Sequence, residues 1–365
     1  MDYIRPIEGK RLRLGTLAYL ADLAGCGTIR VVLPSILLNQ YNSKDIQFQQ
    51  FFLYAFTKDL TIYNKVSYVI FQRSATKKQL ELIDLFKTKI SPLTGAKAIY
   101  EIDDLLIDIP KWNYAYKYYQ SEGSCMKDIM RKCDGLVVST QKLKDVYMQY
   151  NPNINVVPNH LAKFYWGEAE FRGRSNNIKP RILYPGSSNH FAQKGSKEKG
   201  GDFGETLINF IRKTTDEYEW HFMGGHPLEI KDLIDSGKIS WHPWKSVYEY
   251  PAYLKSIKAD FAIAPLSDGI FNECKSNIKM LEFTAAGIPC IYKNIYPYYN
   301  CYMRFDKEEE LIEKIEQMKR QPSLRETTWQ RDYESVKDQL FWEENGNLIK
   351  YVNAHLAFCN KELLL

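Results

Sequence analysis

Residues 271–292 read FNECKSNIKMLEFTAAGIPCIY, and this stretch decides the fold. Ser276 is a typical N-cap residue, and Gly287 followed by Pro289 is a typical helix end. The apolar residues after the proline have the character of a buried strand. The stretch therefore predicts a helix that packs on a sheet and leads directly into the next strand of that sheet.

Three polar side chains share one stripe of this predicted helix. At 100° per residue, Lys275, Lys279 and Glu282 fall together beside the apolar stripe that would face the sheet. Backbone N–H groups at a helix N-terminus attract anions, so a diphosphate at this end and a sugar hydroxyl on the carboxylate would satisfy the whole stripe. The alternative is a surface helix with an ordinary lysine and glutamate pair.

Apolar runs of strand length alternate with amphipathic segments on both sides of this stretch, as in parallel sheets covered by helices. The runs lie at 12–19, 67–72, 96–102, 135–140 and 154–159, and then at 181–186, 218–224, 239–244, 261–266 and 289–294. Helices are expected near Thr28 and at 77–89, 142–151 and 204–215. A charged stretch at 167–180 separates the two series, and 342–358 is the clearest amphipathic helix after them.

The pattern predicts an α/β chain with two Rossmann-like domains that bind a ligand in the cleft between them. We expect an acceptor-binding domain at 1–170 and a nucleotide-sugar-binding domain at 171–335. The helical segment at 336–365 is expected to cross back onto the first domain.

Composition excludes several classes of protein. The 365 residues are 45% hydrophobic and 25% charged, which is typical of globular chains rather than disordered ones. No apolar run reaches the ~18 residues that span a bilayer, and the N-terminus lacks a signal-peptide core, so we expect a cytoplasmic protein without integral membrane association. Seven cysteines without close pairs predict reduced thiols, and the net charge of +5 permits a phosphate-bearing partner without requiring one.

The 271–292 block resembles the nucleotide-sugar motif of retaining glycosyltransferases with the GT-B fold, the group that includes glycogen synthase. That motif has two glutamates separated by seven residues, then Gly-x-Pro and a strand. Glu282, Gly287 and Pro289 match it, whereas Cys274 stands at the first glutamate position. The resemblance implies that Glu282 holds the donor ribose, and that the donor phosphates and sugar contact Lys275, Ser276 and Asn277.

Two glycine-bearing loops resemble loops of the same family. In AGCGTIR at 24–30, Gly25 and Gly27 would let the backbone approach the donor; Arg30 stands where a dinucleotide fingerprint needs its third glycine. In the loop after 181–186, Gly186 and Ser187 match a Gly-(Arg or Ser) element, and Lys199 matches the basic residue that follows it. Lysines here would neutralise a diphosphate leaving group, although a solvated charged loop is the alternative.

Catalytic candidates come from strand ends that would face the cleft. Asp103 and Asp104 follow the run at 96–102 and are candidates for the base that an inverting transfer needs; a helix cap is the alternative. If the reaction retains configuration, as the resemblance favours, the departing phosphate can take the acceptor proton instead. His190 would donate to a phosphate oxygen or satisfy a turn, and Arg73 would reach a ligand or form an ion pair. We expect no metal and no cofactor, with a nucleoside diphosphate sugar, preferably a UDP-sugar, as co-substrate.

The acceptor is less constrained by sequence. The Gly-Cys-Gly loop resembles the start of phage DNA alpha-glucosyltransferases, and WEEN at 342–345 is similar to segments of phage-encoded glycosyltransferases. These matches favour 5-hydroxymethylcytosine in phage DNA, which would place the protein in the host cytoplasm. Basic residues at 76–79 and 111–120 are candidate contacts, and the alternative for 111–120 is a helix whose tyrosines pack on their own domain. The alternatives are a glycan or cell-wall polymer as the acceptor, and a non-catalytic protein that binds nucleotides or sugars.

Overall fold

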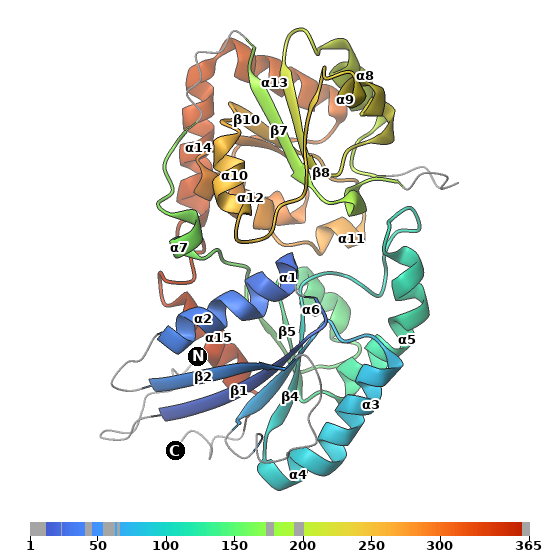
Figure 1. Cartoon of the computed structure of the whole chain (residues 1–365), viewed down its shortest axis with the longest axis vertical. Coiled ribbons are helices and arrows are strands. Elements are labelled where there is room, and N and C mark those ends of the chain that lie inside the picture. The colour runs from blue at the N-terminus through green and yellow to red at the C-terminus, as the bar shows by residue number, and fades with distance from the viewer. Residues whose placement is uncertain are drawn as a thin grey trace.

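The computed structural model describes residues 12–22, 24–40, 46–53, 63, 66–172, 179–192 and 201–359. Within these ranges the chain forms two six-stranded parallel sheets, one in each half of the molecule (Figure 1). The first sheet has the order β2-β1-β3-β4-β5-β6. Its strands are β1 (Leu12–Leu20), β2 (Ile46–Leu53), β3 (Tyr68–Gln72), β4 (Lys97–Ile102), β5 (Gly135–Val138) and β6 (Ile154–Val156).

The second sheet has the order β12-β11-β10-β7-β8-β9. Its strands are β7 (Arg181–Gly186), β8 (Glu219–Gly224), β9 (Ser240–His242), β10 (Phe261–Ala264), β11 (Cys290–Lys293) and β12 (Arg304–Phe305). In both sheets the strand order changes direction beside the first strand of the series, between β1 and β3 and between β7 and β10. Ligands of open α/β sheets bind at the carboxyl ends of strands at such switch points, and in this molecule those ends face the space between the two halves.

Helices cover both faces of each sheet. The first half contains α1 (Gly25–Gly27), η1 (Thr28–Val32), α2 (Leu33–Gln40), α3 (Lys77–Leu85), η3 (Phe86–Ile90), α4 (Ser91–Thr94), α5 (Tyr116–Lys132) and α6 (Gln141–Tyr147). The short helix α7 (Lys163–Trp166) follows in the connection, and Trp166 packs against the second half. The second half contains η4 (Ser188–His190), α8 (Glu205–Lys213), η5 (Leu228–Ile230), α9 (Lys231–Asp235), α10 (Tyr250–Ser256), α11 (Ile270–Glu273), α12 (Ile278–Ala286), η6 (Tyr296–Tyr298), α13 (Glu308–Arg320) and α14 (Pro322–Val336). The last helix within the described residues is α15 (Asn347–Leu356).

Burial on both faces explains the apolar runs of the sequence. Every residue of β3 is buried, and alternate side chains enter different cores: Val69 and Phe71 lie in one cluster, Tyr68 and Ile70 in the other. The second sheet is likewise sandwiched between two apolar clusters. Strands buried on both faces are typical of parallel sheets wrapped by helices, so the predicted α/β class is confirmed.

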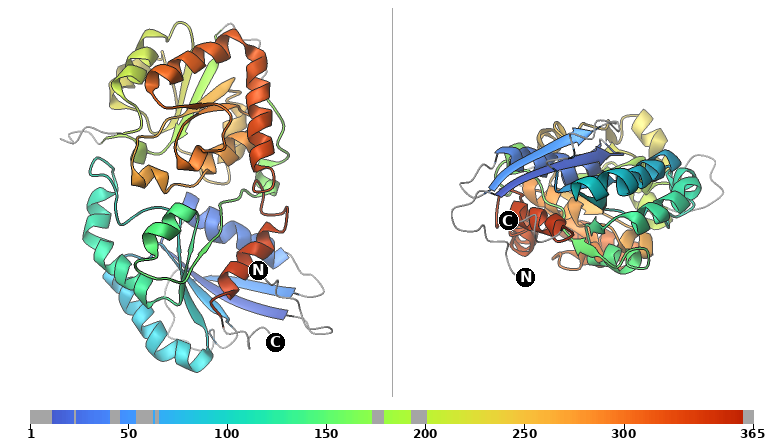
Figure 2. Two further views of the ribbon diagram at one scale, coloured as in Figure 1. Left: turned by 180° about the vertical axis from the view of Figure 1, so that it is seen from behind. Right: turned by 90° about the horizontal axis from the view of Figure 1, so that it is seen from below.

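The chain crosses between the halves twice, and the two crossings pair with each other. Leu161 forms an isolated parallel bridge with Phe341; its N–H donates to Leu340 O over 2.8 Å, and Trp342 N–H donates to Leu161 O over 2.9 Å. After the second crossing, α15 packs on the first sheet, where Tyr351 shares a cluster with Tyr68 (Figure 2). Two Rossmann-like domains with a returning C-terminal helix are the GT-B arrangement, and the predicted fold is confirmed.

Some elements were not predicted from the sequence, namely β2, β12 and α13. The proposed division at 170/171 and 335/336 stays a prediction, and part of the connection between the two series lies outside the described residues. Among the described helices, none is both long and apolar enough to cross a membrane.

Candidate functional site

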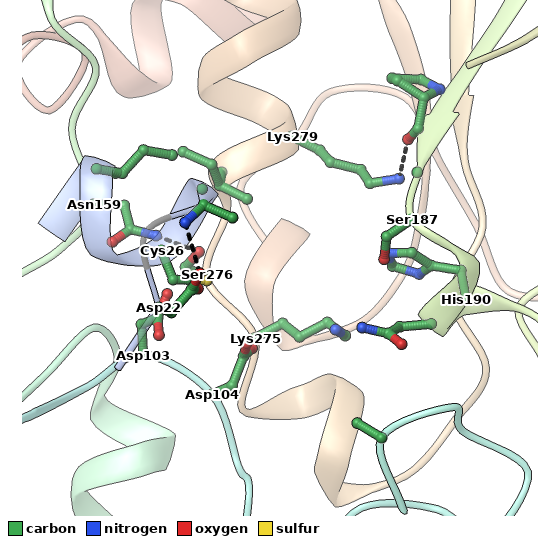
Figure 3. A pocket seen from close by; sticks show the side chains of 18 of the residues that line it. Asp22, Cys26, Asp103, Asp104, Asn159, Ser187, His190, Lys275, Ser276 and Lys279 are labelled. Carbon is green, nitrogen blue, oxygen red and sulfur yellow. Dashed lines mark hydrogen bonds between the residues drawn. The ribbon is translucent and has the colours of Figure 1, made fainter. Parts of the chain in front are cut away.

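A cavity of about 480 Å³ lies between the two halves, at the carboxyl ends of strands from both sheets (Figure 3). The first half contributes the loops after β1, β3 and β4, and the second half contributes the loop after β7 together with α12. Of the residues predicted to bind or react, those that line the cavity are Gly25, Asp103, Asp104, Gly186, Ser187, His190, Lys275, Ser276 and Glu282. Lys199 lies outside the described residues.

The wall formed by the first half, here called the acidic wall, consists of Asp22, Asp103, Asp104 and Arg73. Arg73 Nε donates to Asp103 Oδ1 over 2.8 Å, and Nη2 also bonds to Asp104. Asp22 lies 3.6 Å from Nη1. Arg73 has φ +50°, a left-handed conformation that costs free energy and concentrates at functional sites. One guanidinium thus organises three carboxylates, which leaves this wall with a net negative charge.

The two adjacent aspartates differ in proton affinity. Burial raises the pKa of Asp103, and the opposing effect of Arg73 does not cancel it. Burial would also raise the pKa of Asp104, but Arg73 and Lys275 outweigh it and hold that pKa below its usual value. Asp103 is therefore the better proton acceptor of the pair.

Cys26 lies beside the two aspartates, and ligand atoms of the three residues come within 4.8 Å of one another. Burial raises the pKa of the Cys26 thiol well above its ordinary value, which opposes the thiolate that a metal needs. Both carboxylates already accept hydrogen bonds from Arg73. These residues fit an ion-pair network better than a metal site, and the expectation of no metal stays a prediction.

The wall formed by the second half, here called the basic wall, contains Lys275 and Lys279. Lys275 Nζ lies 4.7 Å from the Phe271 ring, and Lys279 Nζ donates to Pro185 O over 2.6 Å. In the described part of the chain neither lysine forms a salt bridge with a carboxylate. Burial lowers the pKa of Lys279 to about 8, so this lysine is mostly charged at neutral pH. Both are available to an anion.

The start of α12 differs from the prediction by one residue. Asn277, not Ser276, is the N-cap, and it makes no side-chain cap hydrogen bond. Ser276 Oγ instead accepts from Asn159 Nδ2 over 2.8 Å, which joins the two halves across the cleft. Asn277 pairs with Gln339 of the returning chain over 3.1 and 3.0 Å and lies outside the cavity lining, so its predicted donor contact is not supported by the geometry.

Glu282 lies deeper in the basic wall, and among the described residues Tyr250 is its one side-chain hydrogen-bond partner. Tyr250 Oη donates to Glu282 Oε2 over 3.1 Å. Burial raises the pKa of Glu282 to about 7, against the opposing effects of Lys279 and Tyr250. At neutral pH the buried carboxyl of Glu282 is therefore close to half-ionised. Together with the Tyr250 phenol it offers both hydrogen-bond donors and acceptors, which suits the binding of two neighbouring hydroxyl groups.

His190 and Asp202 form a pair in the loop after β7. His190 Nδ1 lies 2.6 Å from Asp202 Oδ2, and Asp202 Oδ1 accepts from the Ser267 N–H over 2.7 Å. Burial lowers the pKa of His190 to about 4, and Lys279 adds to this effect. The imidazole is thus neutral at pH 7 in the free protein.

Glycines allow the loops of the cavity to approach each other. A side chain at Gly224, whose φ is +86°, would come within 2.5 Å of Gly186 O. Gly25 has open space in front of it and lines the cavity. Gly27 is not among the residues that line the cavity: an added Cβ would lie 1.7 Å from Asp22 O, so this glycine allows α1 to pack closely against the end of β1.

Sequence reasoning missed four lining or supporting residues. Asp202 and Tyr250 partner predicted residues, and Trp244 and Lys245 line the second half of the cavity. Trp244 is 61% exposed, which is unusual for tryptophan and indicates an available stacking surface. Arg30, next to the first loop, is buried, and its Nε donates to Glu101 Oε1 over 2.7 Å, so it supports the fold.

No protein-family profile matches the chain, and no curated protein matches its sequence. Among solved structures, the N-terminal domain of trehalose-6-phosphate phosphatase from Candida albicans is similar with a TM-score of 0.55 and 11% identity, over 98% of this chain and 100% of that chain. UDP-GlcNAc 2-epimerase from Neisseria meningitidis, bound to UDP-GlcNAc, is similar with a TM-score of 0.47 and 13% identity, over 94% and 99% of the two chains. Likeness at these identities concerns the fold alone.

Proposed function

We propose that this protein is a glycosyltransferase that moves a sugar from a nucleoside diphosphate sugar to an acceptor hydroxyl. The observation that carries the proposal is the cavity itself, which has a basic wall beside an acidic wall at the switch points of two sheets. Lys275, just before α12, and Lys279, in its first turn, form no salt bridge with a carboxylate in the described part of the chain. A polyanion in this half would satisfy both lysines and the helix N-terminus.

The donor would lie against the basic wall. Lys275 and Lys279 would bind its diphosphate, and Glu282 with Tyr250 would bind the ribose hydroxyls. The exposed face of Trp244 would stack on the nucleobase. Lys199 stays a predicted phosphate contact. We keep a UDP-sugar as the expected donor on the strength of the motif around Glu282.

The acceptor would lie against the acidic wall, where carboxylates can orient a hydroxyl. Asp103 would take the hydroxyl proton as the oxygen attacks the anomeric carbon, because its pKa is the higher of the two aspartates. In a retaining transfer the departing diphosphate would take that proton instead, and Asp103 would only position the hydroxyl. In either case the lysines stabilise the charge that develops on the leaving group.

For the acceptor we propose 5-hydroxymethylcytosine in DNA, with a neutral glycan as the alternative. Tyr114 and Tyr118, near the start of α5, are 65% and 52% exposed, and Lys111 and Lys117 lie close to them in sequence. Exposed aromatics interleaved with lysines suit a strand with bases and phosphates. The net negative acidic wall favours an uncharged reacting group, which both acceptors provide, and phosphates would stay outside the cavity.

The donor assignment is tested with Glu282→Ala. We expect UDP-glucose and related donors to bind the wild type, and the variant to bind at least tenfold more weakly, since a charged hydrogen bond contributes about 1.5–3 kcal/mol. Glu313→Ala, on the exposed face of α13, is the matched control and should bind like the wild type. Equal donor affinity in wild type and Glu282→Ala would refute the assignment.

The acceptor assignment is tested by nucleoside mass spectrometry after incubating hydroxymethylcytosine DNA with donors and protein. A hexose or pentose mass on the modified nucleoside is the expected result. No added mass with any of several donors, together with release of UDP in the presence of a glycan, would replace DNA by the glycan. Donor binding without turnover on either acceptor would instead indicate a non-catalytic binding protein.

A further inference from the structure

Asp202 holds the imidazole ring of His190 in a fixed orientation. Asp202 is 5% exposed, and its Oδ1 accepts from Ser267 N–H, Ser267 Oγ and Asn272 Nδ2 over 2.7, 3.1 and 3.2 Å. Its Oδ2 is thereby turned to His190 Nδ1, 2.6 Å away. Because Asp202 Oδ1 is fixed by donors from a separate segment, the carboxylate holds the ring of His190 in one orientation.

The same hydrogen bonds determine the protonation states of Asp202 and His190 in the protein without ligand. Burial alone would raise the pKa of Asp202, but its hydrogen bonds from His190 and Ser267 outweigh burial and hold it below its usual value. Asp202 is therefore a carboxylate and His190 Nδ1 carries the hydrogen between them. The other ring nitrogen, Nε2, then carries no proton, and among the residues that the structure describes no hydrogen bond occupies its lone pair, so it can take a proton from the cleft.

Several charged groups act on the imidazole. Lys279 of α12 and Lys275 just before it disfavour its protonation, whereas Asp202 favours it. Asp104 of the acidic wall is also electrostatically coupled to His190, and the ring of Tyr184 on β7 packs edge-on, 6.3 Å between centroids. In Figure 3 both lysines extend toward the loop that carries Ser187 and His190. A diphosphate bound by these lysines would thus lie next to His190.

Binding of the diphosphate reverses the electrostatic balance at this ring. The two lysines that repel a proton would be neutralised by the ligand, and the ligand would add negative charge on the open side of the imidazole. Asp202 already supplies a carboxylate on the other side. An imidazole between two anions is stabilised as the imidazolium, which would donate from Nε2 to a phosphate oxygen.

We infer that donor binding is coupled to the uptake of one proton by His190, and that Asp202 is the positioning residue which presents Nε2 to the donor diphosphate. This inference rests on the proposed function, because it requires a diphosphate on the basic wall. The imidazolium of His190 would then be a third cation in the site, beside Lys275 and Lys279, and it would form only when the donor is bound. Asp202 acts through His190 and does not touch the donor.

The inference predicts a pH dependence of donor affinity with a defined sign. A group that is protonated more readily in the complex favours binding at low pH, so affinity should fall as pH rises above about 4, the pKa of free His190. One linked proton changes affinity by at most about tenfold per pH unit. Glu282 and Lys279 titrate in overlapping ranges, so the decisive quantity is the difference between the wild type and His190→Gln.

The experiment is calorimetric titration of the protein with UDP-glucose in two buffers of different ionisation enthalpy, between about pH 5 and pH 8. UDP-glucose is chosen because its phosphates stay ionised throughout. The wild type should take up a measurable fraction of one proton, and His190→Gln should bind with that fraction removed. Equal proton uptake in the wild type and His190→Gln would overturn the inference. Absence of any binding to the wild type would instead overturn the proposed function.

Asp202→Asn tests the positioning role. The amide oxygen would keep the donors Ser267 and Asn272, so the amide NH₂ would face His190 and donate to Nδ1. His190 would then carry its hydrogen on Nε2 and could take up no proton there, so the linked proton should be lost while UDP-glucose still binds. Asp235→Asn, at an exposed carboxylate paired with Lys231, is the control. Wild-type proton uptake in a folded Asp202→Asn variant would refute the role of Asp202, and His190→Gln decides the inference if that variant does not fold.

Discussion

The two walls of the cavity hold their charged groups in opposite ways. On the acidic wall, Arg73 is shared among three carboxylates and every charge has a partner within the wall. On the basic wall, Lys275 and Lys279 contact aromatic rings or a carbonyl, and the nearby carboxyl, Glu282, is hydrogen-bonded to a phenol rather than to a lysine.

This difference shows in which wall the charged side chains are paired within the protein, without a ligand. Charges that are already paired within a protein contribute little to binding a charged ligand, whereas cations in a cavity without a carboxylate partner favour an anion strongly. The basic wall is therefore built for a polyanion and the acidic wall for a neutral hydroxyl group. Substitutions in each wall should accordingly affect different measurable quantities.

The largest effect is expected for Asp103→Asn. An amide cannot accept a proton, so the transfer rate should fall by about 10²–10⁴-fold if Asp103 is the base, with donor affinity changed by less than about threefold. Steady-state transfer rates and UDP-glucose titrations measure the two quantities. A rate within a few-fold of wild type would favour the retaining route, in which the leaving phosphate takes the proton.

Removing the cation of the acidic wall should affect stability more than donor binding. Arg73→Met leaves Asp103 and Asp104 without their shared partner, which is expected to cost about 3 kcal/mol of unfolding free energy at pH 7. Without Arg73 both carboxyls protonate more readily, so the loss should shrink as pH falls toward 4. Urea unfolding at the two pH values measures it.

A matched control for this variant is Arg212→Met, which breaks an exposed ion pair with Asp232. Exposed ion pairs are screened by water and contribute little to stability, so the control should lose far less unfolding free energy. Similar losses in both variants would show that the acidic wall is not the tightly paired unit described above.

The smallest change in stability and donor affinity is expected for Ser276, whose hydrogen bond with Asn159 joins the two halves. Ser276→Ala removes the 2.8 Å hydrogen bond from Asn159 and should cost about 1 kcal/mol of stability, with donor affinity reduced only a few-fold. Ser323→Ala, an exposed serine at the start of α14, is the control. A loss of donor affinity greater than about tenfold in Ser276→Ala would mean that Ser276 contacts the donor directly.

The fold was largely predictable because most strands are apolar on both faces. Residues 68–72 and 261–264 are uninterrupted apolar or nearly apolar runs that stand out from their surroundings. The edge strand Ile46–Leu53 was missed because its IQFQQFFL sequence is interrupted by glutamines. The two-residue β12 offers too short a run for any pattern to show.

The site was predictable only where it is local in sequence. Lys275, Lys279 and Glu282 were found together because helix geometry relates them directly. Tyr250 and Asp202 were missed because their partners lie 32 and 12 residues away and the contacts exist only in the folded protein. The close backbone contact of Gly27 could not be foreseen, because a glycine required by such a contact has the same sequence signature as one required by a ligand.

The paired crossings at Leu161 and Phe341 also limit how the cavity can open. Two independent linkers would let the halves rotate about several axes, but segments that are hydrogen-bonded side by side behave as one ribbon. Bending this ribbon across its width preserves the bonds from Leu161 to Leu340 and Trp342, whereas twisting or shearing it breaks them. We therefore expect hinge bending of the paired segments to cost less free energy than twisting one half against the other, because twisting would break these hydrogen bonds.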